Sequence, residues 1–310
     1  MPPKTDAGGL GLDVGLGLDK TLFERPFSLF EPVVQSVPVV VDVPHAGRRY
    51  SEAFIAASRL NAHGLRRSED AFVDRLFHDA VAMGAPLLVA EFPRAFLDVN
   101  REPYELDPRM FEGRLPPFAN TRSLRVAGGL GTVPRMVGDG QDIYRSRIPV
   151  DDALMRIEKL YRPYHAALRR LTSQTLARFG ACVLVDAHSM PSSSLERDAM
   201  PKADIVLGDR YGTSASGWVV DIAEAHLQEA GFRVVRNRPY AGGFITEAYG
   251  EPQRGLHALQ FELNRAVYMD ETAIAPHGGF EQVRQAIRQA LEGAASEWHA
   301  KFQPHQLAAE

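Results

Sequence analysis

Short runs of aliphatic, mostly β-branched residues alternate with stretches of helical periodicity along most of the chain. The runs at residues 39–43 and 181–187 are apolar almost throughout, which is typical of strands buried on both faces of a parallel sheet. Residues 257–265 alternate between apolar and polar side chains, so a strand there has two unlike faces. The remaining strands are predicted at residues 85–91, 204–208 and 232–235.

Helical periodicity fills most of the chain between these runs. A first helix is predicted from Ser51, and a second runs from Ser68 with one apolar stripe until Gly84 ends it. Ser68 is a credible N-cap, and Glu69 and Asp70 would lie in the first turn, where the helix dipole favours acids. Further helices are predicted at residues 151–179, 217–230 and 280–299.

Strands that alternate with helices predict an α/β fold with three layers (α/β/α) and a mostly parallel central sheet. Because no internal repeat or clean linker is visible, we expect a single catalytic domain over residues 21–310. Residues 1–20, rich in Gly, Leu and Asp, are predicted to form a loose N-terminal arm. Residues 102–150 contain many Pro and Gly, so we expect a loop-rich insertion that folds over the crevice at the strand ends.

Composition narrows the classes of function. The chain of 310 residues has a net charge of −4, which gives no support for nucleic-acid or anionic-membrane binding. No apolar run approaches the roughly 20 residues of a membrane span, and residues 1–9 lack the features of a secretory signal. The single cysteine, Cys182, lies in an apolar strand, which favours a buried, inert thiol and a reducing compartment. We therefore expect a cytoplasmic protein that acts on a small molecule.

Each of the two apolar strands ends in a histidine. His45 directly follows the first strand, and His188 ends the second. If the strands are parallel neighbours, both imidazoles project into the crevice where open α/β sheets bind ligands. Two imidazoles at one rim are a plausible start for a zinc site, although a carboxylate is still needed. Taken singly, most of the ten histidines fit exposed or hydrogen-bonded core positions equally well.

Five short motifs occur in order over roughly residues 30–290. They are Val-Pro-His45-Ala-Gly, Ser-Glu-Asp70-Ala-Phe-Val-Asp74, Pro-Arg94-Ala-Phe-Leu-Asp98-Val-Asn100-Arg101, Val-Asp186-Ala-His188-Ser and Leu-Gln-Phe-Glu262-Leu-Asn-Arg265. Their order resembles the N-formylglutamate amidohydrolase family. The resemblance implies a phosphorylase/hydrolase-like fold similar to that of zinc carboxypeptidases. It also implies hydrolysis of N-formyl-L-glutamate to formate and L-glutamate, a reaction of histidine degradation.

The resemblance also implies a metal site made of His45, His188 and one acid. Asp70 matches the family's acidic position, and Glu69 is the reserve. Two imidazoles and one carboxylate leave a fourth position for water, which is the arrangement of a catalytic zinc site. We expect Zn²⁺, with another divalent ion as the alternative. Such an ion polarises an amide carbonyl and lowers the pKa of water to about 7.

A general base and cationic groups complete the implied site. Glu262 matches the glutamate that acts as base in the carboxypeptidase-like fold, and a polar strand face inside a covered sheet needs such an explanation. The substrate is a dianion, and Arg101, beside Asn100, resembles a carboxylate clamp that lysine could not replace. Arg94 would bind the second carboxylate or the developing oxyanion, the alternative being a surface salt bridge.

Other residues have weaker claims on the site. Arg135, Arg147 and Arg254 are further candidates for the second carboxylate, and His257 either orients Glu262 or substrate or is a core histidine. Asp98 and Asp186 suit supporting positions, where they would hold a histidine tautomer or anchor an arginine.

Two other functions stay open. The first is a related zinc amidase or carboxypeptidase-like hydrolase that acts on another N-acyl amino acid or a short peptide. The second is a non-catalytic ligand- or metal-binding module on the same fold. A nucleotide-binding protein is disfavoured, because neither key strand is followed by a Gly-rich phosphate loop.

Overall fold

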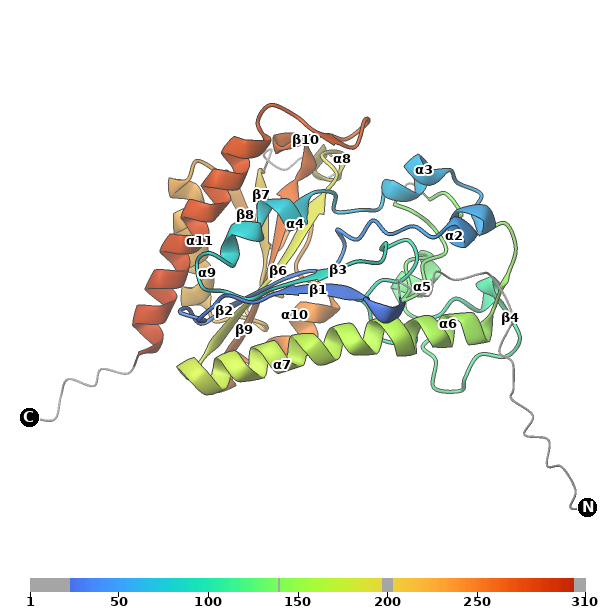
Figure 1. The fold of residues 1–310 in the computed structure, drawn as a ribbon, viewed down its shortest axis with the longest axis horizontal. Helices are drawn as coiled ribbons and strands as arrows, with labels where there is room; N and C mark the ends of the chain where they lie inside the picture. The colour runs from blue at the N-terminus through green and yellow to red at the C-terminus, as the bar shows by residue number, and fades with distance from the viewer. Residues whose placement is uncertain (1–22, 139, 197–202, 304–310) are drawn as a thin grey trace, which may run out of the picture.

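A mixed sheet forms the centre of the molecule (Figure 1). The computed structural model describes residues 23–138, 140–196 and 203–303, so the predicted N-terminal arm lies outside the described residues. Within them, the seven strands of the central sheet lie in the order β1-β3-β2-β6-β9-β7-β8. The strands are β1 (Phe27–Phe30), β2 (Val39–Val43), β3 (Leu87–Ala90), β6 (Cys182–Met190), β7 (Ile205–Gly208), β8 (Val234–Arg236) and β9 (Leu256–Asn264).

Strands β3, β2, β6 and β9, neighbours in that order, run parallel to one another. Strand β1 is antiparallel to β3, and β7 is antiparallel to β9. The predicted three-layer fold with a mostly parallel sheet is therefore confirmed. Strand β1 was not predicted, because four partly exposed edge residues give no clear alternation. Two small pairs lie outside the sheet: β4 (Phe111–Glu112) with β5 (Ile148–Pro149), and β10 (Met269–Asp270) with β11 (Ala275–Pro276).

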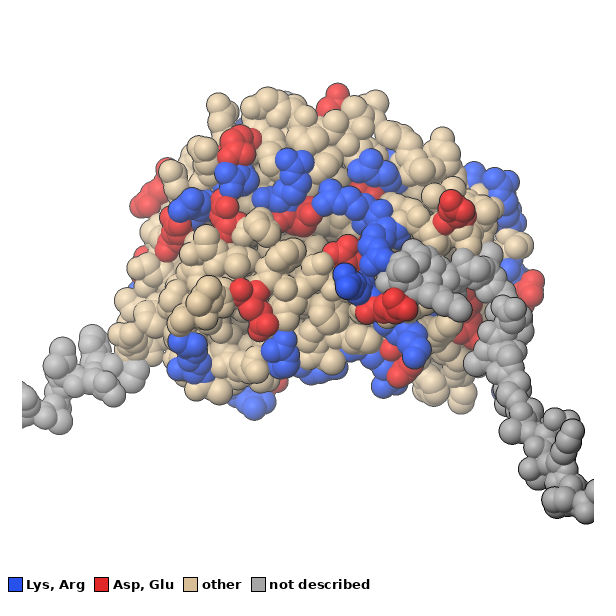
Figure 2. All heavy atoms as spheres, viewed as in Figure 1, with Lys and Arg blue, Asp and Glu red and all other residues tan. Residues whose placement is uncertain are grey.

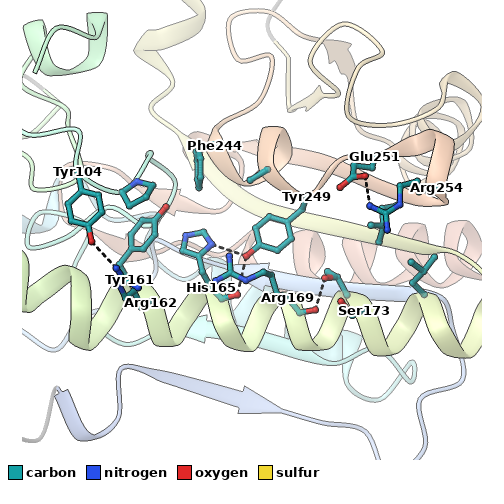
Figure 3. A pocket seen from close by; sticks show the side chains of 15 residues that line it. Tyr104, Tyr161, Arg162, His165, Arg169, Ser173, Phe244, Tyr249, Glu251 and Arg254 are labelled. Atoms are coloured by element: carbon teal, nitrogen blue, oxygen red, sulfur yellow. Dashed lines mark hydrogen bonds and ion pairs between the residues drawn. The ribbon is translucent and has the colours of Figure 1, made fainter. Parts of the chain in front are cut away.

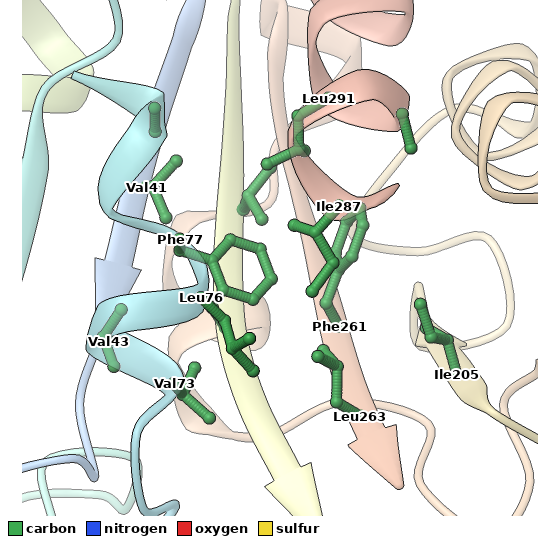
Figure 4. Close-up of a cluster of buried hydrophobic side chains, with 14 of the residues drawn as sticks. Val41, Val43, Val73, Leu76, Phe77, Ile205, Phe261, Leu263, Ile287 and Leu291 are labelled. Atoms are coloured by element: carbon green, nitrogen blue, oxygen red, sulfur yellow. The ribbon is translucent and has the colours of Figure 1, made fainter. Parts of the chain in front are cut away.

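Helices cover both faces of the sheet. On one face the alternate residues of the strands pack against α4 (Val73–Leu76), α9 (Gly217–Glu229) and α11 (Phe280–Phe302), as Figure 4 shows for Val41, Phe261 and Leu291. On the other face lie α7 (Arg162–Phe179) and α10 (Phe244–Tyr249). Smaller helices are α2 (Glu52–Ala57), α3 (Ala62–Arg66), α5 (Leu124–Ala127), α6 (Val150–Arg156) and α8 (Ser193–Glu196).

The surface carries both signs of charge. Figure 2 shows acidic and basic side chains interspersed on the face seen in Figure 1. Ion pairs such as Arg48 with Asp74 and Arg284 with Asp79 join many of the charged side chains of the molecule. Among the described helices, none is both apolar enough and long enough to cross a membrane.

The prediction of one long helix from Ser68 to Gly84 is wrong. Only α4 and a 3₁₀ turn at His78–Ala80 are helical there, and Phe72 precedes α4 with a left-handed φ of 67°. The Ser68 hydroxyl does not cap a helix but donates to the carbonyl of Leu65. The cause is long-range, because the backbone N–H of Asp70 donates to the carbonyl of His45 at 3.0 Å. Residues 69 and 70 are thus held in a turn beside the end of β2.

The other predicted helices are present, and a further helix, α10, was not predicted. The helix predicted at residues 151–179 is present as α6, a π-helical turn at Ile157–Tyr161, and α7, which ends at Gly180 with a φ of 74°. Helix α10 was expected to be loop, because its six residues lie between glycines and are too few to show periodicity.

The insertion at residues 102–150 has little regular structure, as expected. Its apolar side chains share a core with α7, so it does not form a separate unit. The carbonyl of Leu130 accepts a hydrogen bond from Arg101, which brings the insertion against the arginine predicted to bind substrate. It is also tied to α6 by the fully buried Arg156, whose Nη1 donates to the hydroxyl of Tyr144 at 2.6 Å and whose Nη2 pairs with Asp152 at 2.6 Å.

We expect Arg156→Met to lower the free energy of unfolding by roughly 3–5 kcal/mol, because Asp152 would keep a buried charge without its partner. Urea denaturation followed by circular dichroism measures this change. The control is Arg170→Gln on the exposed side of α7, which should stay within about 0.5 kcal/mol of the original chain. A loss below about 1 kcal/mol for Arg156→Met would contradict the structural importance of this pair.

Candidate active site

Three buried side chains meet at the carboxyl ends of β2 and β6. His45 Nδ1 and His188 Nδ1 lie 3.4 and 3.0 Å from the same oxygen, Asp70 Oδ2. The two strands are parallel neighbours, and Asp42 lies opposite Asp186 in register, so the two histidines reach the same edge. The structure therefore brings together the three residues expected to bind metal.

The donor set fits a small divalent cation. One ligand atom from each of the three residues lies within 4.8 Å of the others. His45 Nδ1 is a buried polar atom without a hydrogen-bond partner in the described part of the chain, and an ion would satisfy it. Burial opposes ionisation of Asp70, but its hydrogen bond with His188 and the charges of His45 and His188 hold its pKa well below the usual value.

Glu69, the reserve ligand, faces elsewhere. Its carboxylate pairs with Arg66 at 3.1 Å, and it does not belong to the cluster of potential ligands. The geometry thus favours Asp70 as the acidic ligand.

A second carboxylate lies behind each histidine. His45 Nε2 donates to Asp98 Oδ1 at 2.8 Å, and His188 Nε2 donates to Asp186 Oδ1 at 2.7 Å. With an ion bound, protonation of Nε2 would leave the lone pair of each Nδ1 free to ligate it, which is the tautomer that a metal ligand requires. Asp98 and Asp186 thus occupy the supporting positions expected from the sequence.

Glu262 lies beside the cluster on β9. It is opposite His188 in the parallel register, and Gln260 Nε2 donates to its Oε1 at 2.7 Å. Burial, together with the charge of Asp70, raises its pKa to about 7, while His188 and Arg94 act in the opposite direction. A carboxyl group that titrates near neutral pH is suited to accept and return a proton.

Arg94 and Arg101 share a carboxylate at the edge of the cluster. Arg94 Nε donates to Asp98 Oδ2 at 3.0 Å, and Arg101 Nη2 lies 3.6 Å from the same oxygen. Burial lowers the pKa of Arg94, but the charges of Asp98, Asp70 and Glu262 more than offset this and raise it. Both guanidinium groups therefore lie where an anionic substrate would approach the cluster.

Asn100 makes hydrogen bonds inside the protein. Its Oδ1 accepts from the backbone N–H of Ile245 at 2.7 Å, its Nδ2 donates to Asp186 Oδ2 at 3.4 Å, and the same Nδ2 lies 3.0 Å from His188 Nε2. Its contact with substrate stays a prediction, and these bonds favour a positioning role behind His188.

Two predicted site residues lie at the opposite edge of the sheet. His257 is the second residue of β9, so at about 3.3 Å per residue it lies roughly 16 Å along the strand from Glu262, and Arg254 ends the 3₁₀ turn that precedes β9. Arg254 pairs with Glu251. His257 stacks on Phe302, which makes it the core histidine of the two alternatives.

The other weak arginine candidates lie in or beside the insertion. The guanidinium of Arg135 is held by Asp107 at 3.1 Å and by Asp142 at 2.6 Å, and Arg147 is exposed just before β5. Arg135 is therefore paired within the protein and Arg147 is exposed. Among the described residues, neither has a contact with the metal-site cluster.

Sequence reasoning gave no role to Arg265, which directly follows β9. It is buried, its Nη2 donates to Asp70 Oδ1 at 3.1 Å, and its Nε donates to the hydroxyl of Ser189 at 3.1 Å. Arg265 therefore holds one carboxylate oxygen of Asp70 while the other faces the histidines. The available signal was its place at the carboxyl end of the strand that carries Glu262.

Tyr240 was missed as well. Burial raises the pKa of its phenol, the charges of Glu262 and Asp70 add to this, and a 3.0 Å hydrogen bond with Ser194 acts against it. Tyr240 lies in a loop after β8 that has no periodic signal.

Comparison with known proteins gives concordant matches. A family model described as N-formylglutamate amidohydrolase matches residues 37–269. An N-formylglutamate deformylase of Pseudomonas aeruginosa is 30% identical over 261 residues, which cover 83% of this chain and 92% of the relative. The N-formylglutamate deformylase of Pseudomonas putida is 29% identical over 269 residues, which cover 86% of this chain and 94% of the relative.

Solved structures agree with these sequence matches. The crystal structure of N-formylglutamate amidohydrolase from Ralstonia eutropha superposes with a TM-score of 0.83 at 34% identity, covering 89% of this chain and 99% of that chain. A gene product from Agrobacterium tumefaciens has a TM-score of 0.58 at 18% identity over 90% of this chain and 98% of that chain, which shows the shared fold alone.

We expect Arg265→Gln to weaken the binding of a divalent ion by about 10- to 100-fold, because Asp70 loses the charged donor that orients it. Competition between the protein and a chromophoric chelator for Zn²⁺ measures this affinity. Arg288→Gln is the matched control, since that side chain pairs only with Glu292 on the surface of α11. Equal affinities in the two variants, at native circular dichroism, would show that Arg265 does not orient the ligand.

Proposed function

This chain belongs to the N-formylglutamate amidohydrolase family, and from that premise we propose that it hydrolyses the formyl amide of N-formyl-L-glutamate to formate and L-glutamate. The observation that carries the proposal is the meeting of His45, Asp70 and His188 with Glu262 and an arginine pair in one buried site. Neither another N-acyl substrate nor a non-catalytic role is needed to account for this arrangement.

We propose zinc as the ion held by His45, Asp70 and His188. Two imidazole nitrogens and one carboxylate oxygen are ligands typical of a catalytic zinc with one open position. When bound, the ion polarises the amide carbonyl and lowers the pKa of a water molecule to about 7. Asp98 and Asp186 contribute by keeping both histidines in the ligating tautomer.

Glu262 moves the proton in this proposal. It removes a proton from the attacking water and then delivers a proton to the departing amine. Its pKa of about 7 means that both the ionised and the protonated forms are accessible near neutral pH. Gln260 holds Oε1, so that the second oxygen, Oε2, serves as the acceptor.

The arginines recognise the dianionic substrate. Arg101 binds the α-carboxylate through parallel hydrogen bonds, and Arg94 faces the oxygen on which negative charge develops. The support for this division is that the charges of Glu262 and Asp70 act on Arg94, whereas Arg101 is held by the carbonyls of Leu130 and Asn100. The dicarboxylate substrate is thus the partner that we assign to the chain, within histidine degradation in the cytoplasm.

We expect the purified protein to release formate from N-formyl-L-glutamate much faster than acetate from N-acetyl-L-glutamate, because a larger acyl group must fit beside Glu262. Coupled formate and acetate assays measure the two rates. Dialysis against a chelator should abolish formate release, and added Zn²⁺ should restore it. Full activity at a metal content far below one ion per chain would refute the metal-dependent mechanism.

We expect Glu262→Gln to retain Zn²⁺ binding and to lose about 10²- to 10⁴-fold in kcat, because the amide cannot take up the proton. Metal analysis and the formate assay test both halves of this statement. Glu292→Gln, an exposed change on α11, is the control and should keep normal turnover. Substantial activity in Glu262→Gln would remove its assigned role.

A further inference from the structure

A groove lies between α7 and α10, apart from the metal-site cluster (Figure 3). Its volume of about 490 Å³ is in the range of small-molecule sites. None of His45, Asp70, His188 and Glu262 lines it. The proposed function therefore does not account for this groove.

The groove has a surplus of positive charge. Arg162 pairs with Glu158, and Arg254 pairs with Glu251. Arg169 has no carboxylate partner among the residues that the structure describes; it hydrogen-bonds the neutral phenol of Tyr249. His165 adds no charge near neutral pH, because burial, with the charge of Arg169, lowers its pKa to about 4. A carboxylate, which guanidinium binds through two parallel hydrogen bonds, would complement Arg169.

The walls of the groove are aromatic. The rings of Tyr161 and His165 lie 4.3 Å apart between centroids, and Tyr249 stacks on His165 at 5.9 Å with an interplanar angle of 15°. Phe244 meets His165 edge-on at 5.8 Å. Such walls favour a ligand with a flat apolar body.

The same walls hold the segment that leads to the metal-site cluster. Tyr161 donates to the carbonyl of Arg101 at 2.7 Å, and His165 Nε2 donates to the carbonyl of Val99 at 2.9 Å. Between these residues, Asn100 accepts from the first turn of α10 and lies against His188. Tyr161 belongs to the π-helical turn, a rare local structure that is frequent at functional sites.

We propose that this groove is an effector site for a small organic carboxylate with a flat apolar body, anchored by Arg169. A bound ligand contacts Tyr161 and His165, which hold the backbone of residues 99–101. Because Asn100 in this segment lies against His188, occupancy of the groove changes turnover. The effect on turnover rests on the proposed function, whereas binding of the carboxylate does not.

Calorimetric titration of the zinc-loaded protein with benzoate tests the site, and the neutral isostere benzamide tests the need for charge. We expect benzoate to bind saturably and benzamide at least about tenfold more weakly, since a charge-assisted hydrogen bond is lost. Arg169→Gln should weaken benzoate binding at least about tenfold while leaving basal turnover unchanged. Arg170→Gln, the next residue of α7, lies outside the groove and should bind benzoate normally.

In the formate assay, benzoate should change kcat of the original chain in a pattern not competitive with N-formyl-L-glutamate, and this change should be lost in Arg169→Gln. Competitive inhibition, unaltered binding by Arg169→Gln, or binding that leaves turnover unchanged would each overturn the effector site. If no formate is released under any condition, the proposed function fails, and the calorimetric comparison still decides whether the groove binds a carboxylate.

Discussion

The buried charge of Asp70 is the constraint on which the rest of the site depends. An ionised carboxylate in the interior costs several kcal/mol unless close partners compensate it. Here both histidines face one of its oxygens, Arg265 donates to the other, and its own N–H is bound by the carbonyl of His45. These partners come from the ends of β2, β6 and β9, so the charge is compensated only when all three strands are assembled. The site is therefore complete only in the assembled sheet.

The convergence of the two histidines could be predicted because it follows from local patterns. Each apolar run is short, each ends in histidine, and parallel neighbours bring their carboxyl ends to one edge. The turn at Asp70 could not be predicted in this way. The apolar spacing after residue 71 is the same whether or not a helix begins at Ser68, and the hydrogen bond to His45 joins residues 25 positions apart.

The charged residues illustrate a different limit. Sequence marks Arg254, His257 and Arg265 equally as polar residues near one strand, but strand direction sends the first two to the far edge and the third to the site. Residue type also does not indicate which polar atoms already make hydrogen bonds within the protein. Asn100 follows the family pattern, yet its hydrogen bonds join α10 to Asp186, the partner of His188, so the helix and the site are mechanically connected.

The two Nδ1 atoms that face Asp70 bear on which ion the site would hold. This nitrogen is one bond nearer the main chain than Nε2, so the position of each imidazole ligand would follow closely the position of its backbone. Because β2 and β6 are hydrogen-bonded neighbours about 4.8 Å apart, the pairing of the strands would limit how far the two nitrogens can separate. A pair of imidazoles with one carboxylate would suit zinc, whereas calcium takes six to eight oxygen ligands.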